Sequence, residues 1–300
     1  MCGIVGLHLK NPDLQPRLGE LLSVMLEAMT TRGPDSAGIA VYADPAGSPG
    51  TGLQYSLRSE TGTDWELLGK AIAADTDSEV RVRRLGRDSA VLESGADEAL
   101  FLAAVRRAAP DATVVGYGHS MVLVKDVGAP ADICARYGIP GWSGYQGSGH
   151  TRMATESAVT TAHSHPFAPA ADLALVHNGS FSNYATVRAR LARAGVYCDT
   201  DNDSEVAARL VATRLAEGDS LDDALRTVLK EMDGFFTLLV TTRTQFAVVR
   251  DSFACKPAVI AETGDYVAMA SEYQALARLP GVGSAEVFEP MPEEIHVWSR

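Results

Sequence analysis

The sequence predicts an α+β fold in which two antiparallel sheets stack face to face and helices cover them. Strand-like segments lie near both ends of the chain, amphipathic helical segments lie between them, and glycine or polar turns separate the short strands near the C-terminus. Grouped strands and grouped helices are typical of antiparallel sheets covered by helices, whereas strict alternation would indicate a parallel sheet. With 300 residues the chain is long enough for one large domain, or for a domain that carries an insertion.

The N-terminal part begins with a strand and then a helix. Residues Ile4 to Leu9 form an apolar run that favours a strand. Between Arg17 and Met29 the apolar side chains recur with the spacing of one helical face, which predicts a helix with a buried stripe. A second strand is predicted for Ala37 to Ala43, and the Gly-, Pro- and Ser-containing stretch from Ala46 to Gly52 marks a boundary.

Residues 52–145 are predicted to form a subdomain inserted into a single domain that spans residues 2–300. The local patterns predict two helices and several strands there, at 65–74 (helix), 80–92 (strands), 97–108 (helix) and 117–124 (strand). The Gly-rich stretch 141–149 is predicted to close the insertion. A segment of this length with its own secondary structure is usually functional, so we expect a role in docking a partner or in gating, with a surface subdomain that has no such role as the open alternative.

The chain after the insertion reads as strands, two helices and more strands. Strands are predicted for His150 to Ala154 and for Leu173 to Val176. Helices are predicted for 204–216 and 220–232, the second opened by a capping pattern in which Ser220 precedes Asp223 by three residues. Four short β-rich runs follow, at 235–241, 246–249, 259–262 and 266–270.

The charge of the chain excludes several classes of function. Its formal net charge is −12 and its basic residues form no long run, so a nucleic acid would be repelled and no such partner is expected. No apolar run reaches the roughly 18 residues that a membrane span needs, and no charged leader precedes a hydrophobic segment. The sequence therefore predicts no membrane partner and a cytoplasmic location.

The cysteines and histidines predict neither a disulfide framework nor a metal site. Cys2, Cys134, Cys198 and Cys255 are scattered and form no C-x-x-C pair. His163 and His165 form a H-x-H pair, but no cysteine or carboxylate cluster joins it at ligand spacing. We therefore expect no metal and no cofactor.

Cys2 is the candidate nucleophile. It follows Met1, and a residue as small as cysteine normally permits removal of the initiator methionine, which leaves a thiol and a free α-amine on one residue. An α-amine with an unperturbed pKa of roughly 7.7 to 8.0 can accept the thiol proton near neutral pH, so no distant histidine is needed. Many proteins carry a cysteine at this position for no catalytic reason, so the rest of the chain decides its meaning.

Further motifs accompany Cys2 in a fixed order. They are Met1-Cys2-Gly3-Ile4-Val5-Gly6, Arg32-Gly33-Pro34-Asp35-Ser36, Gly149-His150-Thr151-Arg152-Met153-Ala154-Thr155, His165-Pro166-Phe167, His177-Asn178-Gly179 and Asp203-Ser204-Glu205, with looser matches at Arg250-Asp251, Lys256-Pro257 and Ala270-Ser271-Glu272. This set resembles the class II glutamine amidotransferases, which belong to the N-terminal nucleophile hydrolases. The resemblance covers residues 2–43 and 149–290, and leaves the middle of the chain unexplained.

The resemblance implies a four-layer αββα sandwich and a specific reaction. L-Glutamine would be hydrolysed to glutamate and ammonia through a thioester on Cys2. The Asn178 side-chain amide and the Gly179 backbone N–H would stabilise the oxyanion. The same pair has a plainer explanation, because Asn-Gly is a common turn dipeptide.

The resemblance also implies residues that bind the substrate. Arg152 would grip the α-carboxylate of glutamine, with Thr155 as a second donor, and Asp203 would face the α-ammonium. Asp203 could instead cap the helix that opens with Ser204, and Asp201 could take either role.

Three further positions complete the implied pocket. Arg32 would position the loop over Cys2, and His165 would shape the pocket wall; a purely structural role is an open alternative for both. Pro34 stands where relatives often carry an aromatic residue, so the resemblance does not show how this glutamine pocket is gated.

The ammonia acceptor is expected on another polypeptide. Only about thirty residues follow the last motif, too few for a domain that aminates an acceptor. The amino-acid sequence of residues 150–157 and the segment Lys125-Asp126-Val127-Gly128 resemble the stand-alone amidotransferase subunit of glutamate synthase-like systems. N-Methylglutamate synthase is an example of such a system. The sequence thus predicts a separate acceptor subunit in a hetero-oligomer. Two alternatives stay open, a hydrolase of γ-glutamyl compounds and an inactive regulatory or binding subunit.

Overall fold

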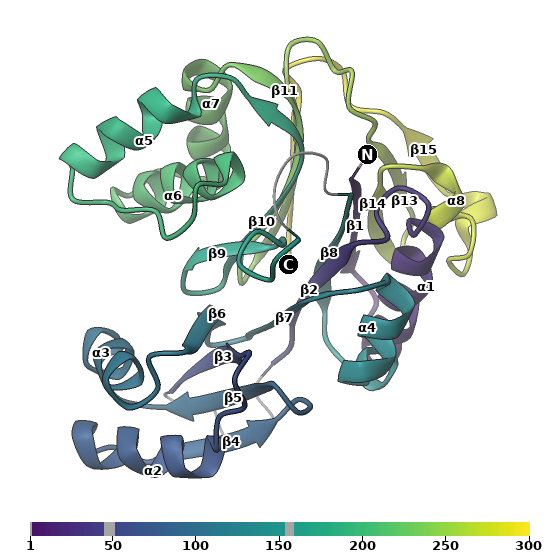
Figure 1. Ribbon diagram of the computed structural model, residues 1–300. Helices are drawn as coiled ribbons and strands as arrows, with labels where there is room; N and C mark the ends of the chain where they lie inside the picture. The colour runs from purple at the N-terminus through teal and green to yellow at the C-terminus, as the bar shows by residue number, and fades with distance from the viewer. Residues whose placement is uncertain (1, 45–51, 154–158) are drawn as a thin grey trace.

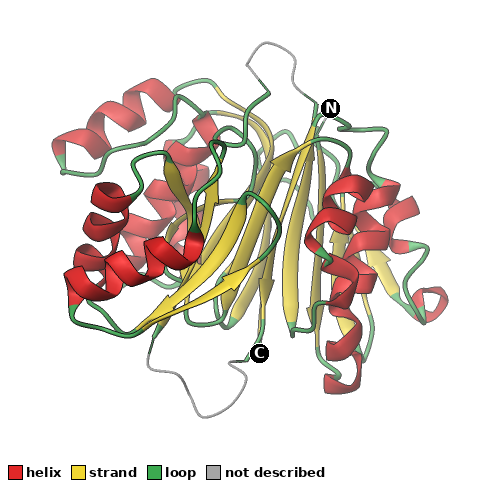
Figure 2. Ribbon diagram, turned by 60° about the horizontal axis from the view of Figure 1, so that its bottom comes forward, coloured by secondary structure: helices red, strands yellow, loops and turns green. Residues whose placement is uncertain are grey.

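The computed structural model describes residues 2–44, 52–153 and 159–300. Two antiparallel sheets stack on each other and helices cover both outer faces, so the layers follow as helix, sheet, sheet and helix (Figure 2). This arrangement confirms the predicted α+β class with stacked antiparallel sheets. In the part of the chain that the structure describes, no helix is long and apolar enough to cross a membrane.

The first sheet carries the N-terminal strand at its centre. Its strands follow in the order β15 (Glu286–Phe288), β13 (Val259–Glu262), β14 (Tyr266–Ala270), β1 (Gly3–Leu9), β8 (Gln146–Arg152), β2 (Ser36–Tyr42) and β7 (Met121–Val127). After the short turn η1 (Pro12–Arg17), helix α1 (Leu18–Ala28) crosses the outer face of this sheet, together with α4 (Pro130–Tyr137) and α8 (Tyr273–Leu276) (Figure 1). Val5 and Leu7 of β1 pack against α1, as the predicted helical stripe requires.

The second sheet contains the strands that follow the middle of the chain. Its order is β16 (Ile295–Ser299), β12 (Gln245–Arg250), β11 (Gly234–Thr241), β10 (Leu173–Phe181) and β9 (Phe167–Ala170). Helices α5 (Tyr184–Arg193), α6 (Asp203–Ala216) and α7 (Leu221–Glu231) cover its outer face (Figure 1). Ser220 caps α7 and accepts a hydrogen bond from Asp223 N at 3.1 Å, which confirms the predicted capping pattern.

The two sheets touch through small and apolar side chains. Ile4 of β1 shares one buried cluster with Val176 and Leu239 of the second sheet. Gly6 lies at the closest approach, because a Cβ atom there would stand 2.4 Å from Leu239 Cδ2 and 2.8 Å from the Phe246 ring. A side chain at Gly6 would push the sheets apart, so this glycine sets the spacing on which the candidate site depends.

A third, four-stranded sheet forms a unit of its own at the bottom of Figure 1. It consists of β4 (Val80–Arg84), β5 (Ser89–Ser94), β3 (Leu53–Ser59) and β6 (Ala112–Gly118), with α2 (Trp65–Thr76) and α3 (Glu98–Ala108). Its separate core is built around Tyr55, Trp65 and Phe101, with the Tyr55 and Phe101 rings stacked at 3.7 Å. This third-sheet unit ends at Gly118. The rest of the predicted segment 52–145 returns to the first sheet, since β7 pairs with β2 over its whole length and α4 joins the core under α1.

The single strand predicted over 117–124 is wrong, because a tight turn divides it into β6 and β7. The Asp172 carboxylate accepts hydrogen bonds from the backbone N–H groups of His119, Ser120 and Met121 at 2.9 to 3.0 Å. Asp172 comes from the loop between β9 and β10, so the turn is stabilised by a residue distant in sequence. The apolar pattern of residues 117–124 alone therefore does not predict this turn.

The stretch 141–149 is only partly a boundary, because β8 already begins at Gln146. Gly147 and Gly149 are strand residues that face α1. A Cβ atom at Gly147 would stand 2.5 Å from Leu22 Cδ1, and one at Gly149 would stand 3.1 Å from the Leu26 methyl groups. The glycines therefore admit the helix close to the sheet, although their local preference indicates a turn. Strands β3, β9, β15 and β16 and helices α4 and α5 were also not predicted.

Candidate active site

The start of β1 and the end of β8 lie side by side at one edge of the first sheet. Gly3 pairs with Thr151 in the antiparallel register, so the next residues outward, Cys2 and Arg152, are neighbours. Strand alternation carries Cys2 to the same side as Ile4, which faces the second sheet. The half-buried thiol is thus directed toward the space between the two sheets.

Arg32 and Ser271 fix the backbone around Cys2. Arg32 Nε donates to the Cys2 carbonyl oxygen at 2.9 Å, and its Nη1 pairs with Glu272 at 2.7 Å. Ile4 N donates to Ser271 Oγ, and Ser271 N donates to the Ile4 carbonyl, both at 2.9 Å. The predicted residue Arg32 therefore contacts the nucleophile's main chain. The motif Ala270-Ser271-Glu272, to which the sequence assigned no role, supplies the partners.

The segment after Arg32 is fitted tightly over the end of β8. A Cβ atom at Gly33 would stand 2.5 to 2.6 Å from backbone atoms of Thr151 and Arg152, so only glycine permits this approach. Asp35 N donates to the Arg152 carbonyl at 3.1 Å, and Ser36 pairs with Arg152 in the sheet. Arg152 is therefore held by the start of the neighbouring strand β2, with its side chain buried.

Asn178 and Gly179 reach the same space from the second sheet. Val176 faces the first sheet, and two residues further along β10 the same side belongs to Asn178. Asn178 is buried, and its Nδ2 donor has no hydrogen-bond partner among the described residues. Gly179 has φ of +150° and would carry a Cβ atom 1.9 Å from the Phe235 carbonyl, so this position admits no side chain. Asn178-Gly179 lies within a strand rather than in the two-residue turn that its composition favours.

Asp203 is held at the first turn of α6 by a chain of hydrogen bonds. Its Oδ2 accepts from Phe181 N at 2.9 Å, and its Oδ1 accepts from the Ser204 hydroxyl at 3.1 Å. Because that hydroxyl donates its single proton to Asp203, it accepts from His177 Nδ1, which lies 2.7 Å away. The sequence did not predict this chain, although both Ser204 and His177 stand inside the quoted motifs.

The two alternatives for Asp203 are not supported by the geometry. Asn202 is the N-cap of α6 and accepts from Ser204 N at 2.8 Å, so Asp203 is not the cap. The Asp201 side chain is 84% exposed and pairs with His163 at 2.5 Å. His163 therefore lies at the surface, whereas His165 is buried between the sheets, and the two members of the H-x-H pair face different surroundings.

Three buried histidines form the polar layer behind these residues. His150 Nε2 donates to the His177 carbonyl at 2.9 Å and thereby joins β8 to β10. The His165 ring lies over the His150 ring, with centroids 4.1 Å apart. Burial lowers the pKa of His150 to about 3 and that of His177 to about 4, and it lowers the pKa of His165 well below its ordinary value. All three rings are neutral at neutral pH.

The structure brings most of the predicted site residues to one place. Cys2, Arg152 and Arg32 meet at the edge of the first sheet, Asn178 and Gly179 lie on the adjacent strand β10, and Asp203 is hydrogen-bonded to Phe181 at the end of that strand. His165 lies one layer deeper, against His150. The prediction for Thr155 falls outside the described residues.

Comparison with known proteins agrees with this arrangement. The family described as glutamine amidotransferase domain matches residues 150–278. The glutamine amidotransferase-like protein GlxB of Rhizobium meliloti is 46% identical over 302 residues, which cover 100% of this chain and 99% of that protein. A glutamine–fructose-6-phosphate aminotransferase of Mycobacterium bovis is 44% identical over 101 residues, which cover 32% of this chain and only 16% of that enzyme.

A solved structure shows the same fold at low sequence identity. The glutamine phosphoribosylpyrophosphate amidotransferase from B. subtilis superimposes with a TM-score of 0.63 and 18% identity, covering 99% of this chain and 47% of the solved chain. This chain therefore spans about half the length of that protein.

The stacked-sheet fold and these matches define a class of enzyme. The fold is that of the N-terminal nucleophile hydrolases, as predicted. The chain belongs to the class II glutamine amidotransferase family, and L-glutamine is the substrate expected of such an enzyme.

The neutral histidine layer predicts that acid destabilises the protein. In the unfolded chain a histidine has a pKa near 6.5, so between pH 7 and pH 5 the unfolded state gains protons that the folded state does not. The free energy of unfolding therefore decreases when the pH is lowered from 7 to 5, by about 2 kcal/mol for His150 alone. Urea unfolding at pH 7 and pH 5 measures this loss. His150→Gln, which keeps a donor near the His177 carbonyl, should lose about 2 kcal/mol less than the wild type.

Ser148→Ala is the matched control, since Ser148 is also buried in β8 but has no group that titrates in this pH range. It should keep the wild-type difference between the two pH values. Equal pH dependence in the wild type and in His150→Gln would contradict the proposed neutrality of the buried ring.

Proposed function

We propose that this enzyme hydrolyses L-glutamine at Cys2 and that the ammonia passes to a separate acceptor subunit. The observation that carries the first part is the buried Asn178 Nδ2, which has no partner among the described residues and stands on the face of β10 that looks toward the first sheet and Cys2. A buried donor without a partner costs free energy, so its retention indicates an acceptor that arrives during the reaction. The oxyanion of an amide hydrolysis is such an acceptor.

The reaction follows from the groups at the two facing strand ends. The free α-amine of Cys2 takes the thiol proton, and the thiolate sulfur attacks the side-chain amide carbon of glutamine. The carbonyl electrons move onto oxygen, where Asn178 Nδ2 and Gly179 N–H stabilise the negative charge. The protonated amine returns its proton to the leaving nitrogen, ammonia departs, and a thioester remains on Cys2. Water, deprotonated by the same amine, cleaves the thioester and releases glutamate.

The other site residues bind or position the substrate in this proposal. The Arg152 guanidinium binds the α-carboxylate, assisted by Thr155, and Asp203 binds the α-ammonium. Arg32 holds the Cys2 main chain through its 2.9 Å hydrogen bond, and His165 supports the wall formed by His150. The fixed orientation of Asp203, held by Phe181 N and the Ser204 hydroxyl, suits a ground-state contact.

The first test of this mechanism is the identity of the N-terminus and of the nucleophile. Intact-mass measurement should show that the active protein lacks Met1, because the mechanism needs the α-amine of Cys2. Cys2→Ala should abolish release of ammonia from glutamine. Cys134→Ala, Cys198→Ala and Cys255→Ala are controls that should retain it, since these free cysteines lie elsewhere. Active protein that keeps Met1 would disprove the mechanism, and faster turnover of γ-glutamyl peptides than of glutamine would favour the alternative hydrolase.

A second test separates oxyanion stabilisation from substrate binding. Asn178→Ala should lower kcat by about 100 to 1,000-fold, because it removes a donor that acts mainly in the transition state. Asp203→Ala and Arg152→Ala should mainly raise KM for glutamine. Steady-state kinetics on the three variants measure both constants. An unchanged kcat in Asn178→Ala would contradict the role of Asn178 in stabilising the oxyanion. The KM values of the other two variants would still test the roles of Arg152 and Asp203 in binding glutamine.

The separate acceptor subunit is supported by how the relatives align. GlxB matches this chain from end to end, whereas the matching part of the Mycobacterium bovis enzyme is 16% of its length. A glutamate synthase-like subunit, such as that of an N-methylglutamate synthase, is the acceptor we propose. The third-sheet unit is its proposed docking element, since Leu67 on α2 and Leu100 on α3 expose large apolar side chains at 65% and 58%.

Copurification from the native host tests this assembly. Tagged wild-type protein should bring down an acceptor-aminating subunit, and the double variant Leu67→Asp/Leu100→Asp should lose it while it keeps glutaminase activity. Tyr197→Asp, at another exposed apolar residue, is the control and should retain the partner. Unchanged copurification with the double variant would exclude this docking surface. A wild-type protein that brings down no such subunit would contradict the proposed transfer of ammonia.

A further inference from the structure

A cavity of about 470 Å³ lies between the third-sheet unit and the catalytic scaffold. One wall comes from β3 and β6, and the other from β7, β9, the loop before β9 and the segment that leads into α6. None of the residues that line it is among the candidate active-site residues, so it is distinct from the glutamine site. Its volume lies in the range of small-molecule sites in proteins, about 300 to 1,000 Å³.

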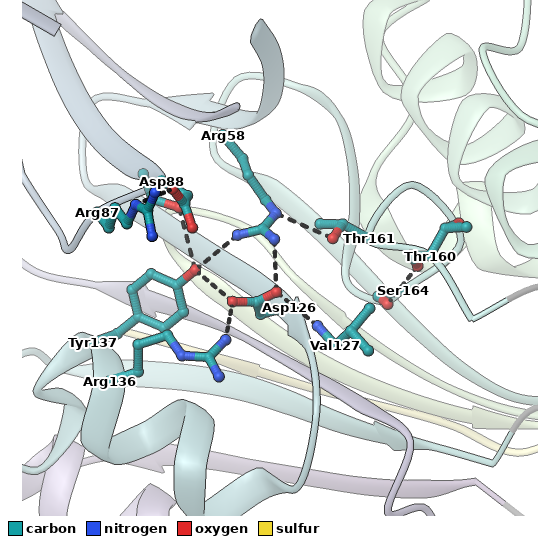
Figure 3. Close-up of polar contacts among 11 residues, drawn as sticks. Arg58, Arg87, Asp88, Asp126, Val127, Arg136, Tyr137, Thr160, Thr161 and Ser164 are labelled. Carbon is teal, nitrogen blue, oxygen red and sulfur yellow. Dashed lines mark hydrogen bonds and ion pairs between the residues drawn. The ribbon is translucent and has the colours of Figure 1, made fainter. Parts of the chain in front are cut away.

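Two of the three cations that line the cavity already form ion pairs with carboxylates. Arg58 pairs with Asp126 at 2.8 Å, and its guanidinium also donates to Thr161 Oγ1 at 3.1 Å and to Tyr137 at 3.2 Å (Figure 3). Arg209 pairs with Glu205 at 3.1 Å and with Asp199 at 2.7 Å. Arg209 thus has two carboxylate partners, and Arg58 shares the Asp126 carboxylate with Arg136.

The acidic residues at the cavity are likewise compensated or placed at its mouth. Glu205 accepts from the backbone N–H groups of Asp199 and Thr200 and from the Thr200 hydroxyl, at 2.7 to 2.8 Å, besides its ion pair with Arg209. Glu60 and Asp111 are exposed to solvent. The buried carboxylate therefore has its own donors, and the exposed carboxylates are hydrated.

Lys125 is different, because it is buried without a carboxylate partner. Its residue is 6% exposed, and its ammonium makes one described hydrogen bond, to the Ser164 carbonyl at 2.9 Å. Nζ forms no ion pair within 4 Å among the described residues, although the Glu205 carboxylate is near enough to act on its charge, and the Phe167 ring centroid is 4.9 Å away. Burial lowers the pKa of Lys125 to about 8, so the amine is still mainly charged at neutral pH. Two of its three donors are left for a ligand.

The remaining walls indicate what kind of anion fits beside Lys125. Phe167, Ala168, Val114 and Val115 are apolar, and Thr113 and Thr161 add hydroxyl groups. A bare inorganic ion would leave the apolar walls without contact. An organic molecule with a short apolar body and an anionic group would cover these walls and compensate the ammonium.

We propose that this cavity binds a small organic carboxylate whose carboxylate group pairs with Lys125. The ligand would contact β6 of the third-sheet unit and β7 and β9 of the scaffold at once, and so would join the two. It would also lie next to the glutamine site. Lys125 stands opposite Gly38 in the sheet, and a Cβ atom at Gly38 would come within 2.1 Å of the carbonyl of His165.

Isothermal titration with succinate as the probe tests the proposal on the full chain. The wild type should bind succinate saturably, and Lys125→Met should weaken binding by at least about tenfold, since a charge-assisted contact is removed. Thr113→Trp should weaken it similarly by filling the cavity from the exposed strand β6. Because Thr113→Trp does not alter the buried residues around Lys125, it tests whether the cavity binds succinate even if Lys125→Met fails to fold.

Arg152→Met is the matched control, because a carboxylate could also bind at the glutamine site. It should bind succinate as the wild type does, within about twofold. Succinate binding that is lost in Arg152→Met and kept in Lys125→Met would overturn the proposal. Absence of saturable binding to the wild type, or binding of inorganic phosphate but not of succinate, would overturn it as well.

Discussion

The antiparallel pairing of β1 with β8 is the constraint on which the candidate site depends. In this register Gly3 stands opposite Thr151, so Cys2 and Arg152 come to the same edge although they are far apart in the chain. The neighbouring strand β2 pairs on the other side of β8 and delivers the Arg32 segment, whose Gly33 fits against the backbone of Arg152. A shift by one residue would turn Cys2 to the helix side of the sheet, because side chains alternate between faces.

The second requirement is the close contact between the two sheets. Gly6 lets β1 approach Leu239 and Phe246, and this spacing brings β10 opposite β1. A hydrogen bond from His150 to the His177 carbonyl crosses the interface near the site. Burial keeps the three histidines neutral, and His177 donates to the Ser204 hydroxyl, which in turn donates to Asp203. The close contact of the sheets thus buries the histidines, and the hydrogen bonds of His177 and Ser204 orient the Asp203 carboxylate.

The third-sheet unit is attached to this scaffold both by polar contacts and by apolar side chains, since Leu85 and Val91 join the core under α1. Arg58 from β3 reaches Asp126 of β7, and Asp126 also pairs with Arg136 and accepts from the Tyr137 hydroxyl (Figure 3). The unit has its own apolar cluster. The cavity lined by Lys125 lies between its strands and the scaffold, so the two are not closely packed there. A ligand there would add contacts between the unit and the scaffold, because strands of both line the cavity.

The sequence by itself determined the candidate site residues and the elements with strong local patterns. Cys2, Arg152, Asn178 and Asp203 were identified by motif, and the first strand, α1, α6 and α7 were predicted within a few residues. Local patterns succeed there because helix periodicity and capping lie within one segment.

Only the tertiary structure decided which of these residues meet, and where local preference is overruled. The turn at His119 depends on Asp172, and strand β8 begins among glycines because α1 must pack against them. The chain from His177 through Ser204 to Asp203, the neutral state of His150 and the unpaired charge of Lys125 likewise arise from segments that are distant in sequence. Burial and long-range hydrogen bonding are properties of the assembled sheets, so no window of the sequence contains them.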